Sequence, residues 1–320
     1  MKIHNLTLIW FLVLSIFMAL STSSTFLIWL SMEMNMMSFI PLIAPKKTMI
    51  STNSTVMYII PQAFASVIFI FLISMQTLNM NITNNLNPLI LLTMILKLGA
   101  APLHTWFPQA AEGMSFSGFF LLTTTQKIIP LHMMSLAPNN TIMIPIISSA
   151  MIGSLGGLNQ FSMRKILAFS SIAHLSWMMS LVMISSTSWM IYISIYALIM
   201  LMILQFNKQT NFNLFTQINL LSPKNSFYFM ISLLTLGGLP PMMGFFIKWM
   251  TLKIVANNLT LISIPLIISS LINLYFYTRL IYPIFLKTLT TNKWAWMNIN
   301  KTLQFTFINL LSIFLIIPMT

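Results

Sequence analysis

The sequence predicts an all-α fold, a polytopic membrane helix bundle of about eleven transmembrane helices, two of them interrupted. Of the 320 residues, 58% are hydrophobic and only 5% are charged, whereas soluble domains carry about 25% charged residues. The apolar residues form runs of about 20, the length of a helix that crosses the hydrocarbon core of a bilayer. These runs fill almost the whole chain, so we expect one transmembrane domain over residues 1–320 and no separate soluble domain.

The expected helices are joined by short segments rich in Asn, Thr, Ser and Pro. The first apolar run follows Lys2 as in a signal peptide, but a second run begins near Phe26, so we expect a retained membrane helix. The approximate helix ranges are 3–21, 25–43, 56–77, 86–102, 117–136, 141–158, 166–184, 188–206, 226–251, 258–283 and 303–319.

Basic residues are distributed unequally between the two ends of these helices. The chain has 15 Lys and Arg residues but only two acids, Glu33 and Glu112. One membrane face receives only Lys253, and the positive-inside rule puts the basic face and the N-terminus on the matrix (or cytoplasmic) side, with the C-terminus opposite. No basic cluster exceeds two residues, so we expect no nucleic-acid partner. The residues expected on the basic face are Lys2, Lys46, Lys47, Arg164, Lys165, Lys208, Lys224, Lys287, Lys293 and Lys301.

Two apolar runs contain helix-breaking residues, at Gly99–Pro102 and at Gly237–Pro241. A pair of hydrophobic segments interrupted by Gly and Pro is typical of transporters that bind their cargo near the membrane midplane. A lysine precedes the first break and another follows the second. The sequence therefore predicts two interrupted helices, each with a buried cation beside its break.

Three lysines lie inside predicted spans, namely Lys97, Lys127 and Lys248. A charge at bilayer depth costs at least about 2.5–3.5 kcal/mol, so three in one chain indicate a function. Each lies near a proline, which frees the carbonyl four residues earlier, and we expect polar backbone around each ammonium group. Because burial destabilises the charged form of lysine, such a residue can release and recapture a proton.

Glu33 is the only acid in the middle of a predicted span. A pair of Glu33 with a lysine that opens and closes would switch that lysine between its protonated and neutral forms, and a static pair would only neutralise its charge. His174 lies mid-span and is either a relay group or a hydrogen-bonded packing residue. Lys165 begins a span and is a possible aqueous entry to the relay, or an anchor of the helix end.

Several kinds of site are missing from the sequence. The absence of cysteine excludes disulfides, thiolate metal sites and iron–sulfur clusters. No glycine-rich phosphate loop stands between a strand and a helix, and metal-ligand clusters are missing. We therefore expect no metal and no cofactor bound by this chain.

The chain resembles the antiporter-like membrane subunits of respiratory complex I, the NADH–ubiquinone oxidoreductase. The likeness extends in order over nearly the whole chain and is carried by the strings KLGAAPLHTWFPQ, QKIIPL, GGLNQFSMRKILAFSSIAHLSW, TLGGLPPMMGFFIKW and LINLYFYTRL. The resemblance implies an antiporter-like fold. Such chains usually have about fourteen helices and animal versions lack the first three, which agrees with our count.

The resemblance also implies roles for the residues singled out above. Glu33 is then the acid of an ion pair, and Lys97, on the first interrupted helix, is its partner. Lys127 is the bridging lysine, His174 lies along the same polar axis, and Lys248 on the second interrupted helix ends it.

The sequence departs from the family in one loop. The family often has Trp-x-Pro-Glu where this chain has Trp106-Phe107-Pro108-Gln109, with Glu112 one turn later. This puts the role of an acid in that loop in doubt.

The function implied by the resemblance is proton translocation in the inner mitochondrial membrane, coupled to electron transfer from NADH to ubiquinone. The NADH, FMN, iron–sulfur clusters and ubiquinone belong to partner subunits. Expected partners are other membrane-arm subunits, both antiporter-like and small chains, with accessory subunits and phospholipids. Two alternatives stay open: a structural membrane-arm spacer, and a subunit of a multisubunit cation/proton antiporter. A sodium site prefers carboxylates and carbonyls, and only Glu33 is available inside a span.

Overall fold

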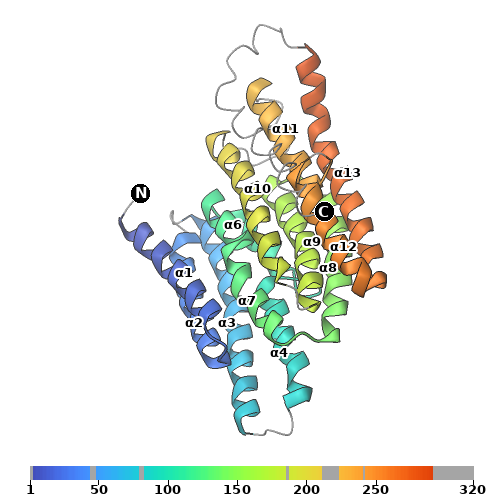
Figure 1. Ribbon diagram of the computed structural model, residues 1–320. Coiled ribbons are helices and arrows are strands. Elements are labelled where there is room, and N and C mark those ends of the chain that lie inside the picture. Colours follow the sequence, from blue (N-terminus) through green and yellow to red (C-terminus); the bar gives the residue numbers. More distant parts are fainter. Residues whose placement is uncertain are drawn as a thin grey trace.

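The computed structural model describes residues 3–43, 48–78, 83–184, 187–210, 223–240 and 242–290, and this part of the chain is a bundle of helices without a β-strand (Figure 1). Every predicted span up to residue 283 coincides with one helix or with two consecutive ones. The span predicted at 303–319 lies outside the described residues.

The first four helices are α1 (Ile3–Ser21), α2 (Thr25–Ile43), α3 (Met49–Leu78) and α4 (Thr83–Leu98). They pack in chain order, α1 on α2, α2 on α3 and α3 on α4. Figure 1 shows that successive helices run in opposite directions, so that alternate connections lie at the same end of the bundle.

The middle of the chain forms α5 (Trp106–Gly113), α6 (Phe116–Thr123), α7 (Thr125–Leu136), the 3₁₀ turn η2 (Asn140–Ile142) and α8 (Met143–Leu158). The single span predicted at 117–136 is divided at Thr124, which is a correction to the sequence analysis. The hydroxyls of Thr123 and Thr124 donate to the Phe120 carbonyl, and Thr125 donates to the Leu121 carbonyl. Such side-chain bonds compete with the helical ladder and bend the helix.

The remaining described helices are α9 (Met163–Met183), α10 (Ser188–Thr210), α11 (Pro223–Gly237), α12 (Met243–Asn258) and α13 (Thr260–Thr290). Helix α9 is the centre of the bundle, because 89% of its apolar stretch is buried, against 33% to 44% in the other candidate spans. A close approach to α8 holds it there: a side chain at Gly153 would meet the Ala173 amide nitrogen at 2.6 Å. Small residues allow this approach in membranes.

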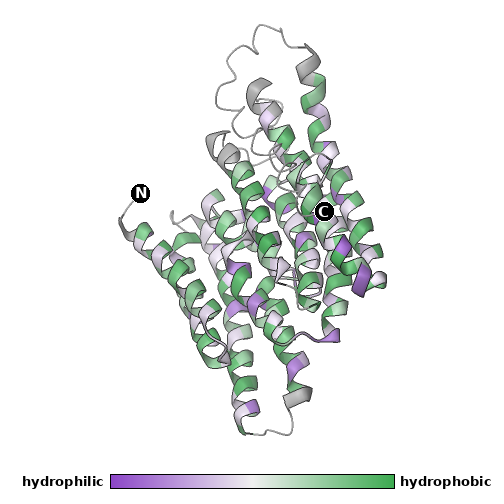
Figure 2. Cartoon of the chain, in the orientation of Figure 1, coloured by the Kyte–Doolittle hydropathy of each residue, from purple (hydrophilic) through white to green (hydrophobic). Residues whose placement is uncertain are grey.

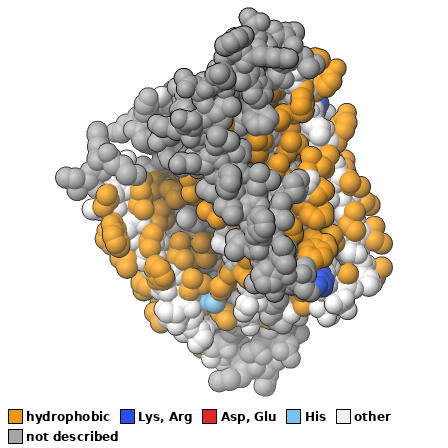
Figure 3. Space-filling model, turned by 45° about the horizontal axis from the view of Figure 1, so that its top comes forward, with side chains coloured by type: hydrophobic (Ala, Val, Ile, Leu, Met, Phe, Trp, Pro, Cys, Tyr) orange, Lys and Arg blue, Asp and Glu red, His pale blue; other side chains and the backbone are white. Residues whose placement is uncertain are grey.

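Several helices have the length and apolar composition that crossing a bilayer requires. Five segments of the described chain are long and apolar enough to cross a membrane, namely α2, α3, Asn140–Leu158, α9 and Thr260–Leu286. Hydrophobic residues cover most of the ribbon in Figure 2, and the described side chains on the face in Figure 3 are mostly hydrophobic. The chain is a multi-pass membrane protein.

Both predicted breaks are confirmed, and they share one geometry. The residue that follows α4 is Gly99, with φ of +67°, and the residue that follows α11 is Gly238, with φ of +80°. At the first break the amides of Gly99 and Ala100 donate to the carbonyls of Leu96 and Ile95, both at 3.1 Å. At the second break the amides of Gly238 and Leu239 donate in the same pattern to the carbonyls of Thr235 and Leu234, at 3.2 and 3.3 Å. This is the Schellman motif, whose left-handed residue is usually glycine.

Candidate functional site

Lys97 lies in the last turn of α4 and is only 7% exposed. Its amine contacts the thioether sulfur of Met32 on α2, 3.7 Å away. The carbonyls near the break have other donors, because Gln62 Nε2 binds the Lys97 carbonyl at 2.9 Å and Trp106 Nε1 binds the Leu96 carbonyl at 3.1 Å. The Lys97 amine has no carbonyl partner among the described atoms, so the expectation of polar backbone around each ammonium group is wrong at Lys97.

Glu33 lies near Lys97 but forms no ion pair with it. The carboxylate is close enough to interact electrostatically with Lys97, yet no oxygen–nitrogen distance within 4.0 Å joins the two side chains. Glu33 Oε1 is buried and has no hydrogen-bond partner among the described atoms. In this arrangement Met32 faces Lys97, and the next residue of α2, Glu33, is rotated by about 100° around the helix, so the pair that opens and closes stays a prediction.

A polar network that the sequence analysis missed joins α2, α3 and α7. Gln126 Nε2 donates to Asn35 Oδ1 at 2.8 Å, and the Tyr58 hydroxyl donates to Gln126 Oε1 at 3.0 Å. Tyr58 also interacts electrostatically with Glu33. The only signal in the sequence was the amide next to Lys127 in the string QKIIPL. Through Gln126, this network extends from the surroundings of Glu33 to the helix of the second lysine.

Lys127 is the most deeply buried of the three lysines, at 1% exposure. Its amine donates to the Ser171 carbonyl on α9 at 3.1 Å and lies 5.3 Å and 5.7 Å from the ring centroids of Phe107 and Tyr196. Aromatic faces attract a cation and partly replace its water. The Ser171 carbonyl is not the one that the nearby Pro130 leaves without a donor. The expectation that each lysine contacts a proline-freed carbonyl is therefore wrong at Lys127.

The expectation that proline-freed carbonyls surround the ammonium group is confirmed at Lys248. It is 7% exposed, and its amine donates to the carbonyls of Gly237 at 2.9 Å and Leu236 at 3.4 Å. These two residues stand four positions before Pro241 and Pro240, the prolines that remove the usual helical donors. The amine also lies at the C-terminal end of α11, where the helix dipole favours a cation.

His174 lies on the central helix between the second and third lysines. Its Nδ1 is 2.7 Å from the hydroxyl of Tyr192, and its ring centroid is 5.0 Å from that of Tyr196. Both Lys127 and Lys248 are close enough to act electrostatically on its imidazole. The structure thus brings together two groups of predicted residues, Glu33 with Lys97, and Lys127 with His174 and Lys248.

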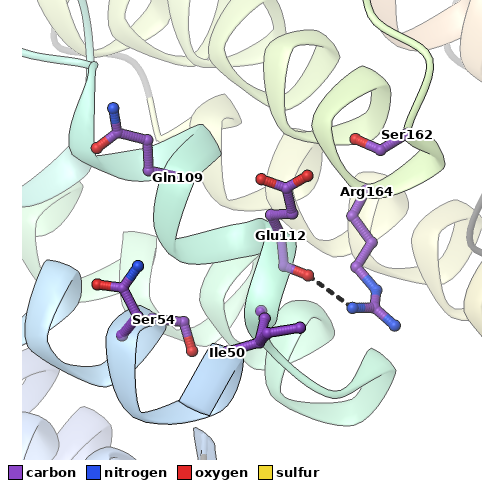
Figure 4. A pocket seen from close by; sticks show the side chains of 8 residues that line it. Ile50, Ser54, Gln109, Glu112, Ser162 and Arg164 are labelled. Carbon is purple, nitrogen blue, oxygen red and sulfur yellow. Dashed lines mark hydrogen bonds between the residues drawn. The ribbon is translucent and has the colours of Figure 1, made fainter.

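Glu33, Lys97, Lys127, His174 and Lys248 are called the row below. Lys165 lies apart from it, in an ion pair with Glu112 at 2.7 Å. The Arg164 guanidinium donates to the Glu112 carbonyl at 2.7 Å (Figure 4). Glu112 and Arg164 border a cavity of about 430 Å³ between α3, α5 and the start of α9. The lining residues are Ile50, Asn53, Ser54, Gln109, Glu112, Gly113, Ser162 and Arg164.

Arg279, on α13, binds the end of another helix. Its Nη1 donates to the carbonyl of Leu158, the last residue of α8, at 2.8 Å. This bond holds α13 against the connection between α8 and α9.

Comparison with known proteins identifies the family. A family model described as "NADH:quinone oxidoreductase/Mrp antiporter, TM" matches residues 22–273. The chain belongs to this family. The match covers every residue of the row, from Glu33 to Lys248.

Curated proteins resemble the chain over nearly its whole length. It is similar to the NADH-ubiquinone oxidoreductase chain 2 of Anopheles gambiae, with 40% identity over 309 residues, 93% of this chain and 90% of that protein. The protein of the same name from Symphalangus syndactylus is 36% identical over an alignment of 330 positions, which covers 94% of this chain and 93% of that protein. The resemblance drawn from the sequence motifs is confirmed.

Solved structures share the fold of this chain. A chain of respiratory complex I from Thermus thermophilus with bound aureothin matches with a TM-score of 0.81 and 19% identity, over 99% of this chain and 80% of that chain. A chain of the Mrp complex from a Dietzia species matches with a TM-score of 0.75 and 16% identity, over 87% of this chain and 59% of that chain. The antiporter-like fold is therefore confirmed, whereas function needs separate arguments at such identities.

Proposed function

We propose that this chain is a proton-translocating subunit of the membrane arm of an NADH–ubiquinone oxidoreductase, in the inner mitochondrial membrane. The names of its relatives, NADH-ubiquinone oxidoreductase chain 2, support the assignment to that enzyme. One observation carries the transport role. Three amines, each at most 7% exposed, lie in the bundle without a carboxylate within 4.0 Å among the described residues.

The proposed first step is a movement of the Glu33 carboxylate. When it approaches Lys97 it stabilises the ammonium form, and when it withdraws, Lys97 releases its proton towards Lys127. A unit charge about 8–10 Å away is worth about 2 kcal/mol at an effective dielectric of about 20, more than a tenfold change in a proton equilibrium. The contact of Lys97 with Met32, in place of Glu33, corresponds to the withdrawn arrangement.

The proton then passes from Lys127 by way of His174 to Lys248, and repulsion between the occupied sites drives its release. The helix-end carbonyls of Leu236 and Gly237 accept the arriving charge. The energy comes from electron transfer in partner subunits, which bind NADH, FMN, iron–sulfur clusters and ubiquinone. Other membrane-arm chains, accessory subunits and phospholipids surround this chain.

We further propose that the basic end of the bundle faces the matrix, with the N-terminus there and the C-terminus in the intermembrane space. Lys165 would then lie on the side where protons enter. Its ion pair with Glu112, which lines the cavity described above, supports a hydrated mouth at this point.

Replacing Lys127 with Met tests the proposal in the assembled complex. Met has nearly the shape of Lys but cannot carry a proton, so we expect proton pumping and coupled quinone reduction to fall severalfold together. Lys253→Met is the matched control, because Lys253 is exposed on α12 beside Trp249. A structural spacer would give unchanged proton stoichiometry in both variants, and that result would reject the relay.

A second candidate is a subunit of a cation/proton antiporter, favoured by the fold shared with the Mrp complex. It predicts that transport into vesicles depends on sodium. We expect no sodium dependence, because Glu33 is the only carboxylate in a predicted span and sodium prefers several oxygen ligands.

A further inference from the structure

Three neutral side chains connect the helix of Glu33 with the helix of Lys127. Gln126, on α7, donates its amide to Asn35 Oδ1 at 2.8 Å and accepts the hydroxyl proton of Tyr58 with Oε1 at 3.0 Å. Asn35 belongs to α2 and Tyr58 to α3, and both are at most 3% exposed. Loss of either bond would leave a buried polar atom without its partner, which is costly. The position of Gln126 therefore depends on both neighbouring helices.

Gln126 lies beside the break between α6 and α7. Thr124, which separates the two helices, has φ of −118° and ψ of −75°, away from the usual helical values. The first amides of a helix lack the acceptors that the preceding turn would supply, and the Lys127 amide instead donates to the Thr124 carbonyl at 3.2 Å. Because Gln126 and Lys127 share this first turn, a displacement of Gln126 moves Lys127 as well.

The Tyr58 hydroxyl has a second acceptor nearby. Glu33 is close enough to interact electrostatically with Tyr58, and Glu33 Oε1 is buried without a hydrogen-bond partner among the described atoms. A hydroxyl has one proton to donate, and a hydrogen bond to an ionised carboxylate is roughly twice as strong as one to a neutral group. A carboxylate that moved to the hydroxyl would therefore replace Gln126 as its acceptor.

Tyr58 lies on the side of α3 that faces Lys97. Gln62, four residues later and on the same face of the helix, donates to the Lys97 carbonyl at 2.9 Å. Trp106, whose ring centroid is 6.0 Å from that of Tyr58, binds the preceding carbonyl of α4. A carboxylate has two oxygens that accept hydrogen bonds. Glu33 can thus bind Lys97 with one oxygen and Tyr58 with the other.

We propose that Tyr58 is a positioning residue whose hydroxyl exchanges between Gln126 and Glu33, and that this exchange transmits the position of Glu33 to Lys127. The inference rests on the proposed relay and adds residues that the sequence motifs did not indicate. Only hydrogen bonds are exchanged, and Tyr58 keeps its own proton throughout.

The exchange has two arrangements. In the structure Glu33 is withdrawn, Tyr58 donates to Gln126, and the first turn of α7 is held with the Lys127 amine 3.1 Å from the Ser171 carbonyl. When Glu33 approaches its lysine partner, Tyr58 donates to the carboxylate and Gln126 keeps only its bond to α2. The first turn of α7 is then less constrained, and the Lys127 amine can leave its carbonyl.

The first test is Tyr58→Phe in the assembled complex. This change removes the hydroxyl and keeps the ring, which packs against Phe39 with the ring centroids 5.1 Å apart. Tyr275→Phe is the control, since this tyrosine is 63% exposed. We expect Tyr58→Phe to lower proton pumping severalfold without changing the KM for NADH. Pumping equal to that of Tyr275→Phe would overturn the proposal.

Gln126→Leu tests the other partner of the hydroxyl. Its matched control is Gln76→Leu, because Gln76 makes the same kind of amide-to-amide bond, to Asn87 at 3.2 Å between α3 and α4, far along the chain from Gln126. We expect pumping to fall severalfold in Gln126→Leu and to stay normal in Gln76→Leu. Equal pumping in the two variants would contradict a specific role of Gln126.

Infrared difference spectra with isotope-labelled tyrosine give a readout that a merely structural role would not change. Addition of NADH should shift a tyrosine C–O band that is missing in Tyr58→Phe, because the acceptor of the hydroxyl changes. The shift should disappear in Glu33→Gln, which lacks the charged acceptor, and in Gln126→Leu, which lacks the neutral one. A shift of wild-type size in Glu33→Gln would reject the exchange.

Should Tyr58→Phe not assemble, two experimental structures of the wild-type complex decide instead, one at rest and one during NADH oxidation. The Tyr58 hydroxyl should lie within hydrogen-bond distance of Gln126 in one structure and of Glu33 in the other. The same acceptor in both structures would show that no exchange takes place.

The lysine variants separate the two levels of inference. Reduced pumping in Lys127→Met and Lys248→Met, together with normal pumping in Tyr58→Phe and Gln126→Leu, rejects the exchange alone. Normal pumping in the lysine variants rejects the relay and the transmission to Lys127 with it.

Discussion

Gly238 can be tested with unusual precision, because the adjacent Gly237 supplies a matched control. Gly238 has φ of +80°, and a Cβ atom there would lie 3.1 Å from both Cδ and Nζ of Lys248. Gly237 ends α11, and a Cβ there would meet Tyr277 at an ordinary 3.6 Å. Gly238→Ala therefore strains both the backbone and the contact with Lys248, whereas Gly237→Ala strains neither.

The expected cost for Gly238→Ala follows from its backbone. A non-glycine residue in the left-handed region costs about 1–2 kcal/mol. The contact with Lys248 adds less, because the end of a long side chain can move by a few tenths of an ångström. That movement nevertheless lengthens the 2.9 Å hydrogen bond from the amine to the Gly237 carbonyl. We expect reduced stability together with weaker pumping.

The assay compares the two variants in the purified complex after reconstitution into vesicles. Thermal inactivation reports stability, and acidification of the vesicle interior per external NADH oxidised reports coupling. Gly238→Ala should have the lower inactivation midpoint and the lower pumping rate, whereas Gly237→Ala should resemble the wild type. Equal behaviour of the two variants would refute the reasoning that the left-handed glycine positions Lys248.

Three further predictions concern the other contacts described above. Glu33→Gln should change the free energy of unfolding by less than about 1 kcal/mol, because no ion pair is lost, and should still lower pumping; a large loss of stability would show that the pair is formed. Gly153→Ala should cost about 1–3 kcal/mol by overpacking, since its Cβ would lie 2.6 Å from the Ala173 nitrogen, and normal assembly and thermal stability would contradict this. A double-mutant cycle between Glu112 and Lys165, whose side chains are 49% and 29% exposed, should give a coupling of only about 0.2–1 kcal/mol that weakens with salt.

The sequence predicted the features that depend on local chemistry. Gly99 and Gly238 end their helices because glycine adopts the left-handed conformation that the Schellman motif requires, and both breaks were expected where they lie. The contact of Lys248 with freed carbonyls also follows from residue spacing, since a proline always leaves the fourth carbonyl before it without a donor.

The contacts that residue spacing does not reveal depend on how one helix is rotated against another. Residue spacing cannot tell that Met32, and not Glu33, faces Lys97, because one residue along a helix turns the side chain by about 100°. It also cannot tell that the side chains of Gln62 and Trp106, and not the Lys97 amine, donate to the carbonyls near the first break. The residues joined by these contacts are up to 65 positions apart in the chain.

The three amines have different surroundings, and this difference gives the row a direction. Lys248 has two carbonyl oxygens, Lys127 has one carbonyl and two aromatic rings, and Lys97 has a thioether, which accepts hydrogen bonds only weakly. With the Glu33 charge removed, we expect Lys248 to keep its proton more firmly than Lys97. Infrared difference spectra of the Glu33→Gln complex with isotope-labelled lysine test this, with Lys97→Met and Lys248→Met to assign the bands. If Lys97 remained an ammonium ion while Lys248 was neutral, protons could not move downhill along the row from α4 to α12, and the proposed direction of transfer would be wrong.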